Sequence, residues 1–254
     1  MIHSSAVVDP AAEIDEAVEI GPYCQIGPGV RIAAGTRIEA HVVIRGETHI
    51  GRDNHIFQFN SLGEDPQDKK YQGEVSSLEI GDHNVIREFC TFNRGTAGGG
   101  GVTRIGDHNW IMAYVHIAHD CRVGNQNILA NGTTLAGHVE VADQVSFGAF
   151  TVIHQFCSIG AHSFSAMGTV ILKDVPPFLM ASGNPAKPRG LNFEGLRRRG
   201  FSPLVLANLK QAYRTVYRQG LSLQQAISVL QSQGCEEVTQ MADFLCASSR
   251  GIVR

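Results

Sequence analysis

Aliphatic residues recur at every sixth position along most of the chain. Counting from the second residue, the steps of six fall on Ile2, Val8, Ile14, Ile20, Ile26, Ile32, Ile38, Ile44, Ile50, Ile56 and Leu62. The same period covers residues 80–92 and 105–171, where one step, Ser165, is polar. A small or β-branched residue stands four positions later, as at Val18, Cys24, Val30, Thr36, Val42 and Thr48. Self-similarity at a fixed period indicates a repeat architecture.

This hexapeptide repeat predicts a mainly β protein, a left-handed parallel β-helix. Each repeat supplies a short strand and a turn, and three repeats make one triangular coil. The coils stack at the strand spacing of about 4.8 Å. The aliphatic side chain points inward and the small residue packs beside it, so stacking buries a continuous core. The left-handed path is an exception to the rule that parallel crossovers are right-handed.

Two polar stretches interrupt the period and are expected to be loops. Residues 63–79 are rich in charge, and residues 93–104 are rich in glycine. Long loops that leave a rigid scaffold tend to carry function. The run "AGGGG" resembles a phosphate cradle, but no Gly-Lys-Ser/Thr follows it and no helix is expected after it. We therefore interpret it as a flexible turn.

Prolines after residue 175 end the period, and helical signals follow. Ser202-Pro203 and Ser222 are typical of helix starts, and a third helix is expected over residues 236–249. The expected organisation is therefore a left-handed β-helix at 1–184, with loops at 63–79 and 93–104, and a C-terminal helical domain at 185–254.

Composition narrows the functional classes. A net charge of −3 and an isoelectric point near 6.4 give no reason to expect nucleic acid as a partner. No apolar run approaches the ~20 residues of a membrane span, and no signal peptide is evident, so we expect a cytoplasmic protein. Four of the six cysteines occupy the small inward position and are interpreted as core: Cys24, Cys90, Cys121 and Cys157.

Four histidines fall in one register of the repeat. Positions 117, 135 and 153 are 18 residues apart, so they stack on successive coils. The histidines beside them are His116, His119, His138 and His154, spread over two strand spacings, about 10 Å. They are compatible with polar surface turns, with a metal site, or with acid–base chemistry near neutral pH. Neighbouring strand residues point to opposite faces, so Asp120 need not contact His119, and no orienting carboxylate is identified.

Several motifs together resemble the UDP-N-acetylglucosamine acyltransferases of lipid A biosynthesis. They are "HIAHDC", "LAGHV", "IHQFC", "IGAHSF", "GEDPQDKKYQGE", "RGT", "GNPA" and "NFEGLRRRGFS", and they cover nearly the whole chain. The resemblance implies transfer of an (R)-3-hydroxyacyl chain from acyl carrier protein to the glucosamine 3-hydroxyl of UDP-N-acetylglucosamine, the first step of that pathway. It also implies a homotrimer with active sites between subunits, and no metal or prosthetic group.

The same resemblance assigns roles to individual residues. His119 is the implied general base, and the Gly137 amide is the implied oxyanion donor. The implied sugar and nucleotide contacts are Asp68, Lys70, His116, His138, His154, Gln155, Asn192, Glu194, Arg198 and Arg199.

Two positions depart from the family pattern. Asn93 stands where a histidine is frequent, so no catalytic role is expected for it. Met167 stands where some members have glycine at the far end of the acyl groove. A methionine there would fill the space of several methylenes, each worth about 0.8 kcal/mol. We therefore expect a short acyl chain, of about ten carbons rather than fourteen.

Three other functions remain as alternatives. A metal-dependent hydratase of the gamma-carbonic-anhydrase type would use the histidines as ligands, although the helical tail speaks against it. A scaffold without catalysis would tolerate loss of His119. The related N-acyltransferase of the same pathway is expected to have a domain before its repeats, whereas here the repeats begin at Ile2.

Overall fold

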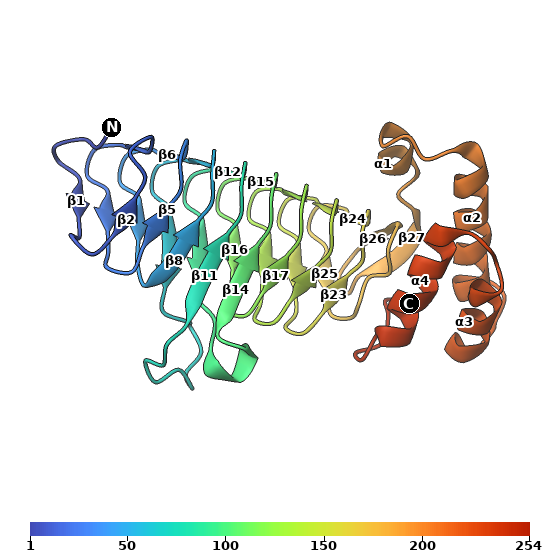
Figure 1. The fold of residues 1–254 in the computed structure, drawn as a ribbon. Helices are drawn as coiled ribbons and strands as arrows, with labels where there is room; N and C mark the ends of the chain where they lie inside the picture. Colours follow the sequence, from blue (N-terminus) through green and yellow to red (C-terminus); the bar gives the residue numbers. More distant parts are fainter.

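The computed structural model describes residues 1–254 and shows a long left-handed β-helix followed by a cluster of helices (Figure 1). Its strands form three sheets. The first sheet consists of β1 (Val7–Val8), β4 (Gln25–Ile26), β7 (Val43–Ile44), β10 (Ser61–Glu64), β13 (Thr91–Asn93), β16 (His116–Ile117), β19 (Thr134–Leu135), β22 (Val152–Ile153) and β25 (Val170–Ile171). The mainly β fold predicted from the hexapeptide repeat is confirmed.

The other two sheets complete the triangular coil. The second consists of β2 (Glu13–Ile14), β5 (Arg31–Ile32), β8 (Glu47–Ile50), β11 (Ser77–Ile80), β14 (Val102–Ile105), β17 (Arg122–Val123), β20 (Glu140–Val141) and β23 (Ser158–Ile159). The third consists of β3 (Glu19–Ile20), β6 (Arg37–Ile38), β9 (His55–Ile56), β12 (Val85–Ile86), β15 (Trp110–Ile111), β18 (Ile128–Leu129), β21 (Ser146–Phe147), β24 (Phe164–Ser165), β26 (Leu179–Ser182) and β27 (Lys187–Leu191).

The register follows the repeat. Ile117 pairs with Leu135 and Leu135 pairs with Ile153, in parallel strands of the first sheet. These aliphatic side chains are fully buried, and so are the small residues beside them, such as Cys24 and Val42. The one polar step, Ser165, is buried too, and its hydroxyl lies 2.8 Å from that of Thr151. A hydrogen bond thus offsets the cost of burying that hydroxyl.

Both loops leave the same edge of the solenoid. One connects β10 to β11 and the other connects β13 to β14, so each passes from the first sheet to the second. We call this edge the loop edge. The glycine-rich loop contains a 3-10 turn, η1 (Ala97–Gly99), and leads into a strand rather than a helix, as expected.

The C-terminal part contains four helices: α1 (Phe193–Arg198), α2 (Pro203–Tyr217), α3 (Leu223–Gln231) and α4 (Glu236–Ala247). The starts predicted for α2 and α3 are confirmed, because the Ser202 and Ser222 side chains accept hydrogen bonds from backbone N–H groups of the first turn. The sequence patterns did not predict α1 or the antiparallel hairpin β26–β27. This hairpin extends the third sheet past residue 185, where the sequence analysis begins the C-terminal domain.

Residues after α4 return to the end of the solenoid. Ile252 forms a parallel bridge with Asp174, whose carboxylate accepts hydrogen bonds from the Ser158 N–H and the Ser248 hydroxyl. The Asp174 side chain is buried by these contacts. The last coil is therefore closed by residues far along the chain.

The four inward cysteines are buried and unpaired, as predicted. Burial raises the pKa of Cys90 and Cys121 to about 12 and that of Cys157 to about 11. Such thiols are poor nucleophiles at neutral pH. No helix of the structure has the length and apolar character needed to cross a membrane.

Candidate active site

His119 and Asp120 form a hydrogen-bonded pair at the loop edge. His119 Nδ1 lies 2.7 Å from Asp120 Oδ2. The sequence-based view that Asp120 need not contact His119, with no orienting carboxylate identified, is therefore wrong. Alternation between faces holds only within a strand, and Asp120 lies in the turn after β16 with φ of 60°. In this left-handed conformation its side chain turns back towards its neighbour.

Asp120 is held by the glycine-rich loop as well. Its Oδ1 accepts from the Thr96 N–H at 2.8 Å, and its Oδ2 accepts from the Thr96 hydroxyl at 2.7 Å. The Asp120 side chain is fully buried. An ionised carboxylate only accepts hydrogen bonds, so the proton of neutral His119 lies on Nδ1. The lone pair of His119 Nε2 is then available as a base.

Gly137 provides the space beside this nitrogen. A Cβ at residue 137 would lie 2.7 Å from Nε2 and 2.6 Å from Cε1 of His119, so no larger residue fits without displacing the ring. Gly137 is a buried residue, and its N–H donates to no acceptor within the chain. Buried N–H groups without partners are rare and are candidates for binding a ligand.

His138 completes this cluster from the next coil. Its ring meets His119 edge-to-face, with centroids 5.1 Å apart, and stacks on Phe156 at 4.4 Å. Burial lowers the pKa of His138, while the nearby charge of Asp120 acts in the opposite direction. His138 is therefore neutral at physiological pH and can accept or donate a hydrogen bond.

His116 and His154 flank the cluster on the first sheet. His116 Nδ1 lies 2.8 Å from the Thr91 hydroxyl, and burial lowers the pKa of this histidine. His154 is exposed beside Gln155, and its Nδ1 lies 3.1 Å from the Gln155 carbonyl oxygen. The repeat thus places all four histidines along one side of neighbouring coils, as predicted.

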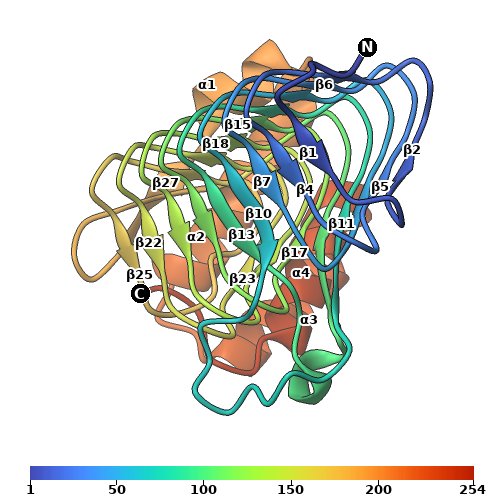
Figure 2. The ribbon, with the colours of Figure 1, turned by 90° about the vertical axis from the view of Figure 1, so that its left-hand side faces the viewer.

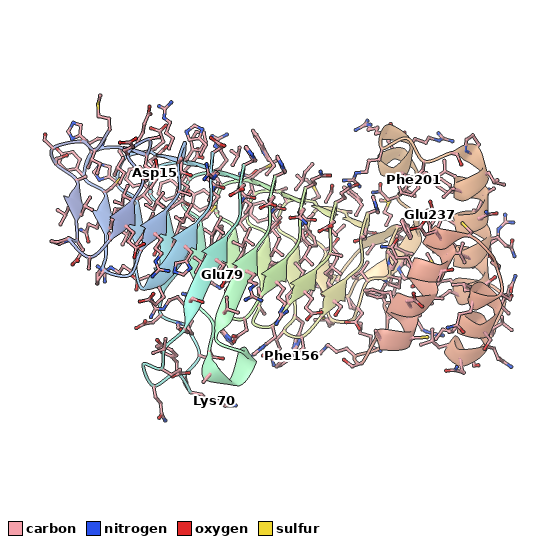
Figure 3. All side chains as sticks on the ribbon, viewed as in Figure 1. Asp15, Lys70, Glu79, Phe156, Phe201 and Glu237 are labelled. Atoms are coloured by element: carbon pink, nitrogen blue, oxygen red, sulfur yellow. The ribbon has the colours of Figure 1, made fainter.

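A cavity of about 780 Å³ opens between the two loops and this cluster. It is lined by three residues predicted from the sequence, Asp68, Lys70 and His138. Its lining also includes residues that the sequence patterns did not single out, among them Tyr71, Gln72, Glu74, Thr96, Ala97 and Phe156. Figure 3 shows Lys70 and Phe156 on the side of the solenoid from which the loops project. Phe156 was discoverable, because it lies 18 residues after His138.

A larger cavity, of about 1020 Å³, runs along the second sheet beside α4. None of the predicted site residues line it. We therefore place the site by its chemistry and not by cavity size.

The remaining polar candidates gather around α1. Asn192 caps this helix and donates to the His162 carbonyl oxygen at 3.0 Å, while Glu194 pairs with Arg198 at 3.0 Å. Arg199 Nη1 is buried without a hydrogen-bond partner. Burial, with the nearby charge of Arg199, lowers the pKa of His162 to about 4.

A single chain therefore does not bring all predicted site residues together. Figures 1 and 2 show α1 on the side of the solenoid opposite the two loops. Met167 lies at a third place, in the turn from β24 to β25, and is 76% exposed. The residues are thus distributed over three edges of the triangular coil.

The loop edge also contains a group that has metal-ligand chemistry. Donor atoms of His119, Asp120 and His138 lie within 4.8 Å of one another. The two oxygens of Asp120 already accept three hydrogen bonds, including the one from His119. The arrangement fits an oriented base better than a cation cage.

The stacked six-residue coils are those of the hexapeptide-repeat class, and comparisons with known proteins identify the chain as one of its transferases. The bacterial hexapeptide transferase family matches residues 11–46 and 103–137. The family described as UDP-N-acetylglucosamine O-acyltransferase, domain 2, matches residues 174–253.

Individual relatives are similar over most or all of the chain. The acyl-[acyl-carrier-protein]–UDP-N-acetylglucosamine O-acyltransferase of Janthinobacterium sp. is 53% identical over 100% of this chain and 99% of its own. That of Thiobacillus denitrificans is 59% identical over 78% of each chain. The crystal structure of the enzyme from Moraxella catarrhalis has a TM-score of 0.98 at 46% identity, over 100% of this chain and 99% of that one. The chain belongs to the UDP-N-acetylglucosamine O-acyltransferase family and is an O-acyltransferase. The hydratase alternative gains no support from these relatives.

Proposed function

We propose that the protein transfers an (R)-3-hydroxyacyl chain from acyl carrier protein to the glucosamine 3-hydroxyl of UDP-N-acetylglucosamine, the first step of lipid A biosynthesis. The names of its relatives support the two substrates. The observation that carries the chemistry is the His119 imidazole, which Asp120 orients and whose Nε2 lies beside Gly137, a residue with an unpaired N–H.

In the proposed reaction, His119 Nε2 removes the proton of the sugar 3-hydroxyl as its oxygen attacks the thioester carbonyl carbon. The negative charge that develops on the carbonyl oxygen receives a hydrogen bond from the Gly137 N–H. The tetrahedral intermediate then collapses, the carbon–sulfur bond breaks, and the His119 imidazolium returns its proton to the leaving thiolate. The products are the 3-O-acylated sugar nucleotide and the free carrier thiol.

The other predicted residues bind the substrates in this proposal. Asp68 and Lys70 contact the sugar and phosphates from the first loop. His116, His138, His154 and Gln155 contact the sugar and nucleotide from the coils, and Asn192, Glu194, Arg198 and Arg199 contact uridine and diphosphate. Because α1 lies opposite the loop edge of its own chain, these last four serve the site of a neighbouring subunit. The proposed assembly is a homotrimer. A cytoplasmic location stays a prediction from the sequence.

Met167 limits the acyl chain in this proposal. Its exposure in a single chain is compatible with a side chain that meets substrate in the assembled enzyme. A chain of about ten carbons is preferred, because each methylene excluded from a buried groove is worth about 0.8 kcal/mol. Replacing Met167 with glycine is expected to lengthen the preferred chain, and an unchanged length profile contradicts this role.

The direct test uses protein that has been treated with a chelator. It is mixed with UDP-N-acetylglucosamine and 3-hydroxyacyl carrier proteins of ten, twelve and fourteen carbons, and products are identified by mass spectrometry. An acylated sugar nucleotide is the expected product, with the shortest chain preferred. If no chain is transferred, the proposal fails.

A further inference from the structure

In the glycine-rich loop, Thr96 makes two hydrogen bonds to the side chain of Asp120, and Thr103 accepts a third from the Asp120 N–H. Both hydrogen-bond donors of Thr96 reach the Asp120 carboxylate, at 2.8 Å from the N–H and 2.7 Å from the hydroxyl. Thr96 itself is buried. The loop also covers Asp120 at Gly99, where a Cβ would lie 2.0 Å from the carboxyl carbon. The segment interpreted from sequence as a flexible turn thus makes close contacts with the carboxylate that orients His119.

The same loop is bonded to the loop that carries Asp68 and Lys70. The Ala97 N–H donates to Glu74 Oε1 at 3.2 Å, and the Asn93 side-chain amide donates to the Asp65 carbonyl oxygen at 2.8 Å. Arg94 donates to the Gly63 carbonyl, to the Asp65 carboxylate and to the Tyr71 hydroxyl. The two loops therefore form one hydrogen-bonded unit, and Thr96 is the residue of this unit that donates to the Asp120 carboxylate.

We propose that Thr96 is a positioning residue that aligns His119 through Asp120. Asp120 Oδ2 has two donors at 2.7 Å, the Thr96 hydroxyl and His119 Nδ1. The Thr96 hydroxyl prevents the carboxyl group from rotating away, so that Oδ2 keeps facing the imidazole. This inference rests on the proposed function, in which His119 is the base. It adds that the glycine-rich loop is part of the catalytic alignment.

The kinetic test compares Thr96→Val with Thr96→Ser. Valine has nearly the same shape but no hydroxyl, whereas serine keeps the donor. Thr96→Val is expected to lower kcat about 10- to 100-fold, because small misalignments of a base cost this much, and to change KM for UDP-N-acetylglucosamine less than threefold. Thr96→Ser is expected to stay within about threefold of the unchanged enzyme in both constants.

Thr133→Val is the matched control. Thr133 is also a buried threonine, although it lies in the solenoid and not in a loop, and its hydroxyl makes one hydrogen bond, to the Ala130 carbonyl at 2.7 Å. The Thr133→Val variant is expected to shift the melting temperature as much as Thr96→Val does but to leave kcat unchanged. Equal losses of kcat in the two variants, or a loss confined to KM, overturn the proposal.

A second measurement needs no substrate. Imidazole ¹⁵N shifts, assigned with His119→Asn, report which nitrogen of His119 carries the proton. The Nδ1–H form is expected to predominate in the unchanged protein and in Thr96→Ser, and both nitrogens are expected to share the proton in Thr96→Val. Identical shifts in all three proteins overturn the positioning role. If the unchanged enzyme transfers no acyl chain, the proposed function fails, while these shifts still decide the role of Thr96.

Discussion

Two columns of residues in this molecule share the same 18-residue step but differ in what they do. Ile117, Leu135 and Ile153 stack inside the solenoid, and all three are fully buried. Asp120, His138 and Phe156 stack at the loop edge, with φ of 60°, 61° and 63°. The inner column repeats one kind of side chain, whereas the outer column has a carboxylate, an imidazole and a phenyl ring. The repeat therefore determines where a residue lies, and the turn conformation determines what it can reach.

The largest expected effect comes from replacing His119, the proposed base at the loop edge. His119→Ala is expected to lower kcat about 10³-fold, within the range for general bases, and to leave the melting temperature nearly unchanged. The control is His108→Asn, which removes a histidine stacked on His83 at another edge of the same solenoid. Steady-state kinetics give kcat for both variants, and equal kcat values contradict the assignment of His119 as the base.

The second-largest effect is expected from adding one methyl group to a glycine, which is expected to lower kcat at the loop edge and not elsewhere in the solenoid. Gly137→Ala places a Cβ 2.6 Å from the His119 ring and is expected to lower kcat about 10²-fold. Gly27→Ala adds the same group on the first sheet, where the nearest atom is 3.4 Å away, and is expected to be neutral. A fully active Gly137→Ala enzyme contradicts the close packing of the ring and the amide.

A smaller difference is expected between two stacked histidines. His138 packs on Phe156 at the loop edge, and His41 packs between Tyr23 and Phe59 elsewhere, both with left-handed backbone. Asparagine tolerates that backbone. His138→Asn is expected to lower kcat/KM about 10-fold, or about 1.4 kcal/mol, and His41→Asn to leave it unchanged. Similar losses in both variants indicate a structural role alone.

The last expected effect concerns stability and pH, and not the rate of the reaction. The pKa of His162 is lowered to about 4 by burial and by Arg199, whereas an unfolded histidine titrates near 6.5. Between about pH 6.5 and 4 the unfolded chain binds a proton that the folded chain does not, so stability falls as pH falls through this window. His162→Asn is expected to show a flatter dependence of melting temperature on pH. If the melting temperatures of the variant and the unchanged protein depend on pH in the same way, the lowered pKa of His162 is contradicted.

The fold was predictable because its pattern is periodic and local. The aliphatic step of six identified the strands, and Ser202 and Ser222 identified the helix starts. The hairpin β26–β27 and α1 were not predicted, because they lie in a Gly- and Pro-rich segment without a period. Their placement depends on tertiary contacts, such as the hydrogen bond from Asn192 to His162.

The site was predictable only in part. The 18-residue step is enough to group the four histidines on neighbouring coils, because it needs only the spacing of residues along the chain. The His119–Asp120 contact was missed because it depends on a left-handed turn, which the strand alternation rule does not cover. The Thr96 contact was missed because the glycine-rich loop has no periodicity to follow. The role of Met167 depends on a neighbouring chain and stays a prediction.

The bridge between Ile252 and Asp174 has a consequence for the protein during its synthesis. Coils are completed in order as the ribosome releases them, and each new coil pairs with the one before it. The most recent coil always presents unpaired strand edges, which are templates for aggregation. The hairpin β26–β27 covers the end of the third sheet, whereas the backbone of Asp174 stays unpaired until residues 251–253 arrive. A nascent chain halted after α4 thus still has an unpaired strand edge at Asp174.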